Sequence, residues 1–183
     1  MKKLFVIAIL AAACVAGHAQ SKSNAAITRQ IKDLGSGKEI KLTYDPDSNV
    51  SKLMGISENF SDTGRSGVQA MNFAIGFMYA GNELSAAPAN VLLTFWVLTK
   101  RPRFAEQHNL ILRANGRDLG PGRYAAKPRE DMEYLNFEIQ REDLVRMATE
   151  TNSSFDLGAF QFSFSRDQQK LIADVLALSD PAR

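Results

Sequence analysis

The sequence is poor in cysteine and histidine. Among its 183 residues it has one cysteine, Cys14, and two histidines, His18 and His108. A disulfide framework and a zinc site built from these ligands are therefore excluded. Nucleophilic catalysis by a Ser-His-Asp or Cys-His set would depend on His108, and no G-x-S-x-G motif is present. We interpret His108 as a structural residue at the mouth of a strand.

The pattern for a calcium-binding loop is incomplete. Asp45, Asp47 and Asn49 have the alternate spacing that opens an EF-hand loop. Val50, however, stands where the loop needs glycine, and Ile56 stands where it needs a bidentate glutamate. We interpret the segment as a turn whose polar side chains bond to nearby backbone, and leave open a looser site of oxygen ligands. The sequence thus predicts no metal and no cofactor.

No apolar run reaches the length of about 20 residues that spans a bilayer. Residues 4–15 form a shorter run, which follows a Met-Lys-Lys start and precedes a small-x-small site ending at Ala19. This arrangement predicts a signal peptide over residues 1–19, cleavage after Ala19, and a periplasmic or secreted bacterial protein. The alternative is a lipid anchor on Cys14, although Ala11 stands where lipoprotein signals carry a large aliphatic residue.

Cleavage would leave a chain without net charge. The leader holds nineteen of the 183 residues, two of the 22 basic residues and none of the 20 acidic ones. A neutral protein is not expected to attract nucleic acid or an anionic membrane surface. The remaining length suits one domain, which can bury enough apolar surface to fold without metal or disulfide.

Alternation of apolar and polar residues indicates a β-rich chain. Strands are expected at residues 40–44, 71–79, 91–99, 109–113 and 133–140, and in a final hairpin over residues 155–164. Turns are expected at Asn115-Gly116, which suits a type I′ hairpin, and at Gly120-Pro121-Gly122. Helices are expected over residues 24–34, over residues 141–149, and from a capping box of Ser165 and Gln168 to Asp180.

The strand over residues 71–79 has one bulky face and one nearly bare face. The bare face carries Ala70, Asn72, Ala74 and Gly76, so we expect another element to approach it closely. We interpret Trp96, on the next strand, as a core residue and not as a platform for stacking sugars.

The predicted fold class is α+β. It consists of a mainly antiparallel β-sheet or β-sandwich of about seven strands with short flanking helices and a C-terminal helix. Residues 20–37 are expected to form an N-terminal helix and linker, and residues 38–183 a single β-rich domain. We expect residues 45–67 to be a loosely attached connection, pinned to the body by Leu53, Met54, Ile56 and Phe60.

Basic residues are concentrated in one segment, residues 100–129, where eight of them face only two acidic residues. The four near predicted turns are Arg101, Arg103, Arg117 and Arg123. Gathered at one end of the sheet, they would bind a carboxylate, phosphate or sulfate group. The alternative is that the hairpins scatter them over faces and edges, where basic residues discourage edge pairing. Strand direction decides between the two.

Carboxylates offer the remaining route to catalysis. Glu130, Asp131, Glu133 and Glu138 lie close together in the sequence. A glycosidase needs two carboxylates that face each other across a cleft, and Glu133 and Glu138 are the candidates for such a pair. Sequence neighbours on a loop do not supply that geometry, and runs of charge are usually solvated.

The segment from Val91 to Leu178 resembles a set of uncharacterised exported bacterial domains. The shared features are VLLTF, NLILRANGRDLGPGRY, MEYLNFEI, REDLVRMATE and GAFQFSFSRDQQKLIADVL. The resemblance implies a secreted β-rich fold with a C-terminal helix, but no activity and no functional residue.

The sequence therefore favours an exported, non-catalytic binding or interaction module of the bacterial envelope. Its partner would be a protein or an anionic ligand, and the four arginines Arg101, Arg103, Arg117 and Arg123 are its predicted contact. The alternatives are a carboxylate-dependent hydrolase of envelope polymers and a lipid-anchored structural protein.

Overall fold

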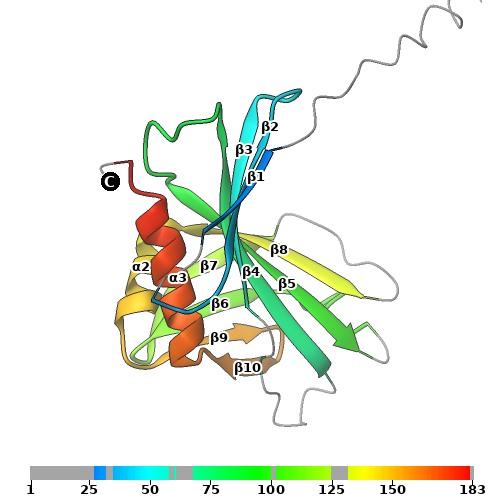
Figure 1. The fold of residues 1–183 in the computed structure, drawn as a ribbon. Helices are drawn as coiled ribbons and strands as arrows, with labels where there is room; N and C mark the ends of the chain where they lie inside the picture. Colours follow the sequence, from blue (N-terminus) through cyan, green and yellow to red (C-terminus); the bar gives the residue numbers. More distant parts are fainter. Residues whose placement is uncertain are drawn as a thin grey trace, which may run out of the picture.

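The fold is an antiparallel sheet that curls around a phenylalanine-rich core, with helices on one side (Figure 1). The computed structural model describes residues 27–31, 35–57, 60, 68–99, 102–124 and 132–181. Its elements are β1 (Ile27–Ile31), β2 (Ile40–Asp45), β3 (Val50–Ser57), β4 (Val68–Ala80), β5 (Asn90–Thr99), β6 (Leu110–Ala114), β7 (Arg117–Tyr124), β8 (Glu133–Gln140), α2 (Arg141–Thr149), β9 (Ser153–Leu157), β10 (Phe160–Ser163) and α3 (Arg166–Leu178). The predicted leader, with Cys14 and Ala19, lies outside the described residues, as do Arg101, Glu130 and Asp131.

The strands form one ten-stranded sheet in the order β1-β2-β3-β4-β5-β8-β7-β6-β9-β10. Every pairing is antiparallel, as the short connections predict. The junction between β7 and β8 is short, because only Arg123↔Glu138 and Tyr124↔Phe137 are paired across it. The mainly antiparallel, β-rich fold class is confirmed, with ten strands where about seven were expected.

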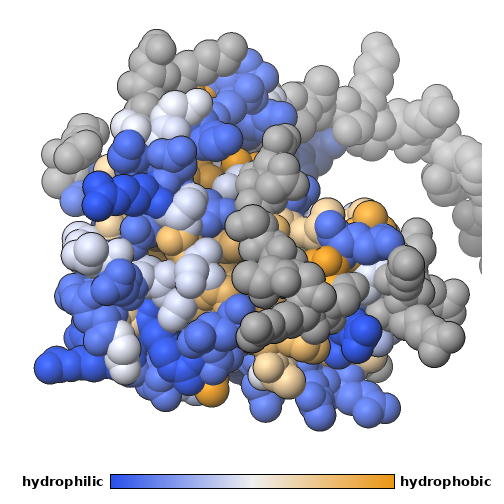
Figure 2. All heavy atoms as spheres, turned by 90° about the horizontal axis from the view of Figure 1, so that it is seen from below, coloured by the Kyte–Doolittle hydropathy of each residue, from blue (hydrophilic) through white to orange (hydrophobic). Residues whose placement is uncertain are grey.

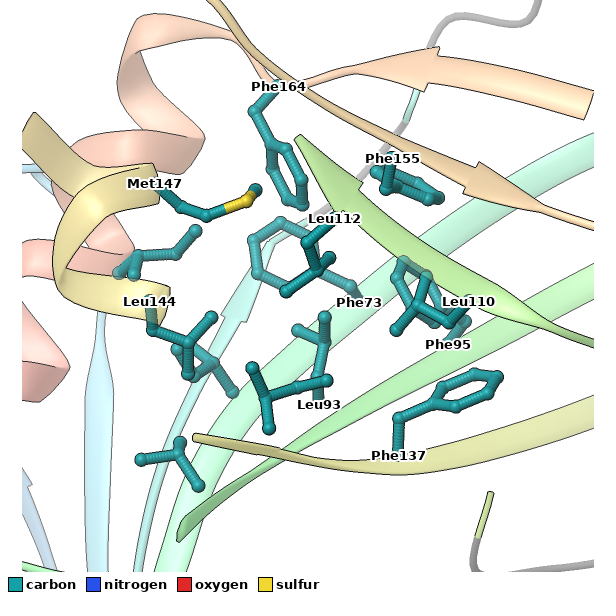
Figure 3. Packing of buried hydrophobic residues seen from close by; sticks show 14 of the residues in the cluster. Phe73, Leu93, Phe95, Leu110, Leu112, Phe137, Leu144, Met147, Phe155 and Phe164 are labelled. Atoms are coloured by element: carbon teal, nitrogen blue, oxygen red, sulfur yellow. The ribbon is translucent and has the colours of Figure 1, made fainter. Parts of the chain in front are cut away.

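Curling of the sheet brings its two halves together. β9 is four strands away from β5 in the sheet order, which would separate them by about 19 Å in a flat sheet. The rings of Phe95 on β5 and Phe155 on β9 are nevertheless 4.9 Å apart between centroids. Figure 3 shows the same arrangement, with side chains of β4, β5 and β8 facing those of β6, β9 and α2. We call the side of the sheet that faces this core the inner face.

The two helices cover the core from one side and pack against each other. Both were predicted, and α2 has the expected bounds. α3 begins at the predicted capping box, in which the Ser165 side chain accepts from the Gln168 backbone and the Gln168 side chain accepts from the Ser165 backbone. Gln169 ties the helices to β9, because its amide nitrogen donates to Met147 O, Glu150 O and Ser153 Oγ.

The helix expected over residues 24–34 is wrong for the part described. Ile27–Ile31 is strand β1, which pairs with β2 in the register Ile31↔Ile40. The four-residue spacing of Ile27 and Ile31 fits one face of a helix, but it equally fits two residues on one face of a strand. The strand is stabilised by pairing with β2, which satisfies the backbone hydrogen bonds of β1. The spacing of apolar residues gives no information on this partner.

Two further expectations are corrected. Eight residues of the supposed connection over residues 45–67 form strand β3, whose Leu53 is buried against the core. Gly120-Pro121-Gly122 makes no turn, because it continues β7 through a register irregularity next to Ile111↔Pro121. The Asn115-Gly116 turn is confirmed, since both residues have the positive φ that a type I′ turn needs.

Candidate binding surface on the outer sheet face

The outer face of the central sheet consists of the side chains that point away from the core. Because side chains alternate along a strand, it takes every second residue of β3, β4, β5 and β8. The strand register aligns these residues in rows across the sheet, one of which is Met54↔Gly76↔Leu92↔Glu138 and another Ile56↔Ala74↔Thr94↔Asn136. The helices lie on the other side, where Leu171 and Val175 of α3 pack close to Gly55.

A groove runs along β4 on this face. Its floor is low because Ala74 and Gly76 have small side chains in the middle of the sheet. Its walls rise on either side, from Met54 on β3 and from Leu92 and Trp96 on β5. The enclosed volume is about 290 Å³. The bare face predicted from the sequence is therefore real, but no helix or strand of the described residues is packed on it.

Exposed hydrophobic side chains gather around this groove. Ile56, Met78 and Leu98 have exposed fractions of 37%, 65% and 41%. All three lie on the outer face, on β3, β4 and β5 respectively. Within the described residues, Val145 on α2 is the other large hydrophobic side chain with comparable exposure. Figure 2 shows one face of the molecule, on which patches of hydrophobic surface lie between hydrophilic residues. Isolated exposed hydrophobic residues are ordinary, whereas a group on one face marks an interaction surface.

The groove also contains a few polar groups. Thr94 Oγ1 donates to Asn136 Oδ1 over 2.6 Å, so the Thr94 hydroxyl and the Asn136 amide oxygen are paired with each other. Lys52 lines one end of the groove and is exposed. Trp96 lines the other end, where its ring makes an edge contact with Tyr134 at 6.4 Å between centroids. An apolar floor with few polar groups is typical of a site for small ligands.

Trp96 was expected in the core and this interpretation is corrected. The residue is half-buried and lies on the outer face, because its register partners Asn72 and Tyr134 are outer-face residues. The alternating pattern of β4 indicated the bare face, but strand β5 is apolar on both sides, so the pattern did not reveal which side Trp96 takes. Leu92 was missed as a site residue for the same reason, and Met54 was missed because its strand β3 was predicted as a loose connection.

The three described arginines of the predicted anionic site do not converge. Arg117 and Arg123 are at opposite ends of β7, about 20 Å apart along the strand. Arg103 lies in the loop that leads to β6, beside the first residue of β8, and Arg123 pairs with Glu138 five residues further along β8. Arg101 lies outside the described residues. Arg103, Arg117 and Arg123 therefore form no single patch, and binding of an anionic ligand stays a prediction.

Glu133 holds a loop in place. Its side chain is 2% exposed and accepts from the backbone nitrogens of Arg103 and Phe104, at 3.0 and 2.7 Å. Thr99 Oγ1 donates to it as well, at 3.3 Å. Glu138 lies on the outer face, whereas Glu133 belongs to the inner face, about 17 Å away along β8. The two carboxylates thus do not face each other across a cleft, as a hydrolytic pair must.

His108 lies just before strand β6, at the strand end where it was expected. Its Nδ1 lies 3.1 Å from the carbonyl oxygen of Phe104, and its ring packs on Tyr124 with centroids 4.0 Å apart. The Tyr124 hydroxyl is buried and has no hydrogen-bond partner among the described residues. Burial raises the pKa of Tyr124, and the nearby charge of Glu133 raises it further.

The segment with alternate Asp and Asn residues is a turn. Asp45 accepts from Ser48 Oγ at 2.7 Å and from the Asp47 backbone nitrogen at 3.0 Å. These bonds, the Ser48 bond first, lower the pKa of Asp45. Across the described ranges, no group of three or more His, Cys, Asp or Glu side chains is arranged to hold a metal ion.

No family model matches the chain, and neither a curated protein nor a solved structure matches it. The resemblance to exported bacterial domains therefore stays a prediction. Of the helices described, neither is long and apolar enough to cross a bilayer.

Proposed function

We propose that this protein is an exported, non-catalytic binding module that recognises an apolar ligand with its outer sheet face. The observation that carries the proposal is the groove over Ala74 and Gly76, flanked by Met54, Leu92 and Trp96. Export rests on the predicted leader. The proposal keeps the binding function expected from the sequence but moves the contact from the arginines to the groove.

The distribution of side chains supports binding over catalysis at this surface. The groove is lined mainly by aliphatic, methionine and aromatic side chains, and Thr94 and Asn136 are bonded to each other. Methionine side chains adapt to the shape of a partner, and Met54 and Met78 both line the groove. Glu138 is on the same face but forms no pair with Glu133, and this separation does not support the hydrolase alternative.

The sole tryptophan of the chain provides a direct test, because Trp96 lines the groove. Titration with Nile red, a neutral apolar dye, should shift the dye emission to shorter wavelength and quench Trp96. Ala74→Phe should abolish both effects, since the larger side chain fills the groove floor. Ala159→Phe is the matched control, because Ala159 is exposed in the turn between β9 and β10.

A second variant keeps the test valid if Ala74→Phe does not fold. Met78→Glu places a charge on the exposed rim, where the fold tolerates it, and it should weaken dye binding severalfold. Circular dichroism establishes that each variant is folded. Equal dye binding by the wild-type protein and both groove variants would refute the proposal, as would the absence of any response in Trp96.

The lipid-anchored alternative is decided by the mature N-terminus. Mass spectrometry of the protein from a bacterial envelope fraction should find a chain that begins at Gln20, with no lipid. A lipid-bearing N-terminus at Cys14 would instead place the binding module at a membrane surface.

A further inference from the structure

The groove has two chemically different ends. Lys52 and Met78 are register partners at one end, and Trp96 pairs with Asn72 at the other. Met78 lies six residue steps along β4 from Asn72, which corresponds to a length of about 20 Å. The groove is thus elongated along the strand, with a cation at one end and an aromatic ring at the other.

The Lys52 ammonium group takes part in none of the ion pairs formed by the described residues. Two other exposed lysines do have carboxylate partners, Lys41 with Glu39 at 3.7 Å and Lys170 with Asp167 at 3.8 Å. Lys52 therefore offers a positive charge at the end of an apolar groove, and an anion there would gain a charge-assisted hydrogen bond.

The floor between the ends suits a hydrocarbon chain. Ala74 and Gly76 line the middle of the groove, with Met54 on one side and Leu92 on the other. Thr94 and Asn136 already bond to each other, so covering their paired atoms with an apolar chain incurs a smaller desolvation cost than covering unpaired groups. The volume of about 290 Å³ is at the lower end for ligand pockets, and it favours one chain over the two chains of a bilayer lipid.

We infer that the ligand is a single-chain anionic amphiphile, an alkyl carboxylate of medium length whose carboxylate lies at Lys52 and whose chain runs along β4 toward Trp96. This inference rests on the proposed function and specifies its ligand. Exposed hydrophobic area accounts for binding of the chain, and charge complementarity sets its direction in the groove.

The experiment compares three ligands with the same chain and different head groups. Dodecanoate, dodecanol and dodecyltrimethylammonium are titrated below their micelle concentrations while Trp96 emission is followed. Dodecanoate should bind tightest, and Lys52→Gln should weaken it about three- to tenfold, to the level of dodecanol. Lys170→Gln removes the same charge on α3 and should leave all three affinities unchanged.

The outcomes separate this inference from the proposed function. Equal affinity for dodecanoate and dodecanol, with no effect of Lys52→Gln, would overturn the anionic ligand and leave the apolar groove in place. No binding of any of the three ligands, together with no Nile red response, would overturn both.

Two controls address other occupants of the face. In the first control, the protein is floated with phosphatidylglycerol vesicles. If flotation depends on Lys52 and Met78 and dodecanoate does not bind, the face binds a membrane surface and the inference is overturned. Sedimentation could also reveal a dimer. If Met78→Glu dissociates this dimer and dodecanoate does not, the face binds a second copy of the chain, and the inference is overturned as well. A monomer that binds dodecanoate and does not float with vesicles supports the inference.

Discussion

Phe73 and Ala74 are neighbours on β4, yet their side chains enter different environments. Phe73 is on the inner face, where its ring meets that of Phe164 at 5.6 Å between centroids, and it is fully buried. Ala74 is on the outer face, where it forms the floor of a groove. Side chains on the inner face fill the available volume, whereas those on the outer face leave volume free. One strand thus fills the core with its odd-numbered residues and leaves an accessible groove over its even-numbered ones.

The largest effect is expected on the inner face. Phe155→Ala removes a ring that contacts Phe95 at 4.9 Å and Phe162 at 5.1 Å, and should lower the free energy of unfolding by about 3–5 kcal/mol. Met78→Ala, on the outer face, should change it by less than about 0.5 kcal/mol because the side chain is 65% exposed. Urea unfolding followed by circular dichroism measures both. Similar losses for the two variants would remove the distinction between the faces.

Glu133→Gln should have the next largest effect. The substitution replaces a buried carboxylate oxygen by an amide that donates, opposite the backbone nitrogens of Arg103 and Phe104. The free energy of unfolding should fall by about 2–3 kcal/mol. Glu138→Gln is the matched control on the exposed side of the same strand and should be nearly neutral. If both variants are as stable as the wild type, the loop is not held by Glu133.

Gly76→Ala tests the groove floor. A methyl group at Gly76 would lie 2.2 Å from the Leu53 carbonyl oxygen, which is backbone and moves only with β3. At Gly55 the nearest atom is a side-chain methyl of Leu171 at 2.8 Å, which can move aside. Gly76→Ala should therefore cost about 1–3 kcal/mol and Gly55→Ala less, as measured by thermal unfolding. The reverse order would contradict the described approach of β3 and β4.

The smallest effect on stability is expected at Tyr124, whose buried hydroxyl has no hydrogen-bond partner among the described residues. Tyr124→Phe removes this group and should raise the free energy of unfolding by up to about 1 kcal/mol. Because the pKa of Tyr124 is raised in the folded protein, folding favours the protonated hydroxyl, and ionisation of Tyr124 costs stability as the pH rises above 10 toward the folded pKa. The wild type should lose stability more steeply than Tyr124→Phe above pH 10, in unfolding curves recorded at a series of pH values.

Local patterns in the sequence predicted the elements that depend on local chemistry. The Asn115-Gly116 turn, the α3 capping box and the alternation of β4 each follow from backbone or hydrogen-bond preferences of a few residues. Strand β1 was predicted as a helix because its spacing fits both structures, and its pairing with β2 is a contact between distant residues. The spacing of apolar residues within β1 does not indicate that β2 is its partner.

The candidate site was only half predictable. The bare face of β4 was evident from Ala74 and Gly76, but whether a helix covers it depends on how the whole chain is arranged. The arginine cluster failed as a single patch because β7 continues through Gly120-Pro121-Gly122 and so carries Arg117 and Arg123 to opposite ends. The sequence pattern did not show the direction of β7, and this direction determines where Arg117 and Arg123 lie.

The most direct test of the account follows the methionine methyl groups by nuclear magnetic resonance while dodecanoate is added. Met54 and Met78 line the groove, whereas Met71 and Met147 are fully buried on the core side. The account predicts that the Met54 and Met78 signals move in proportion to occupancy and that the Met71 and Met147 signals stay in place. Signals of Met54 and Met78 that do not move, or shifts confined to the core methionines, would contradict a binding site on the outer sheet face.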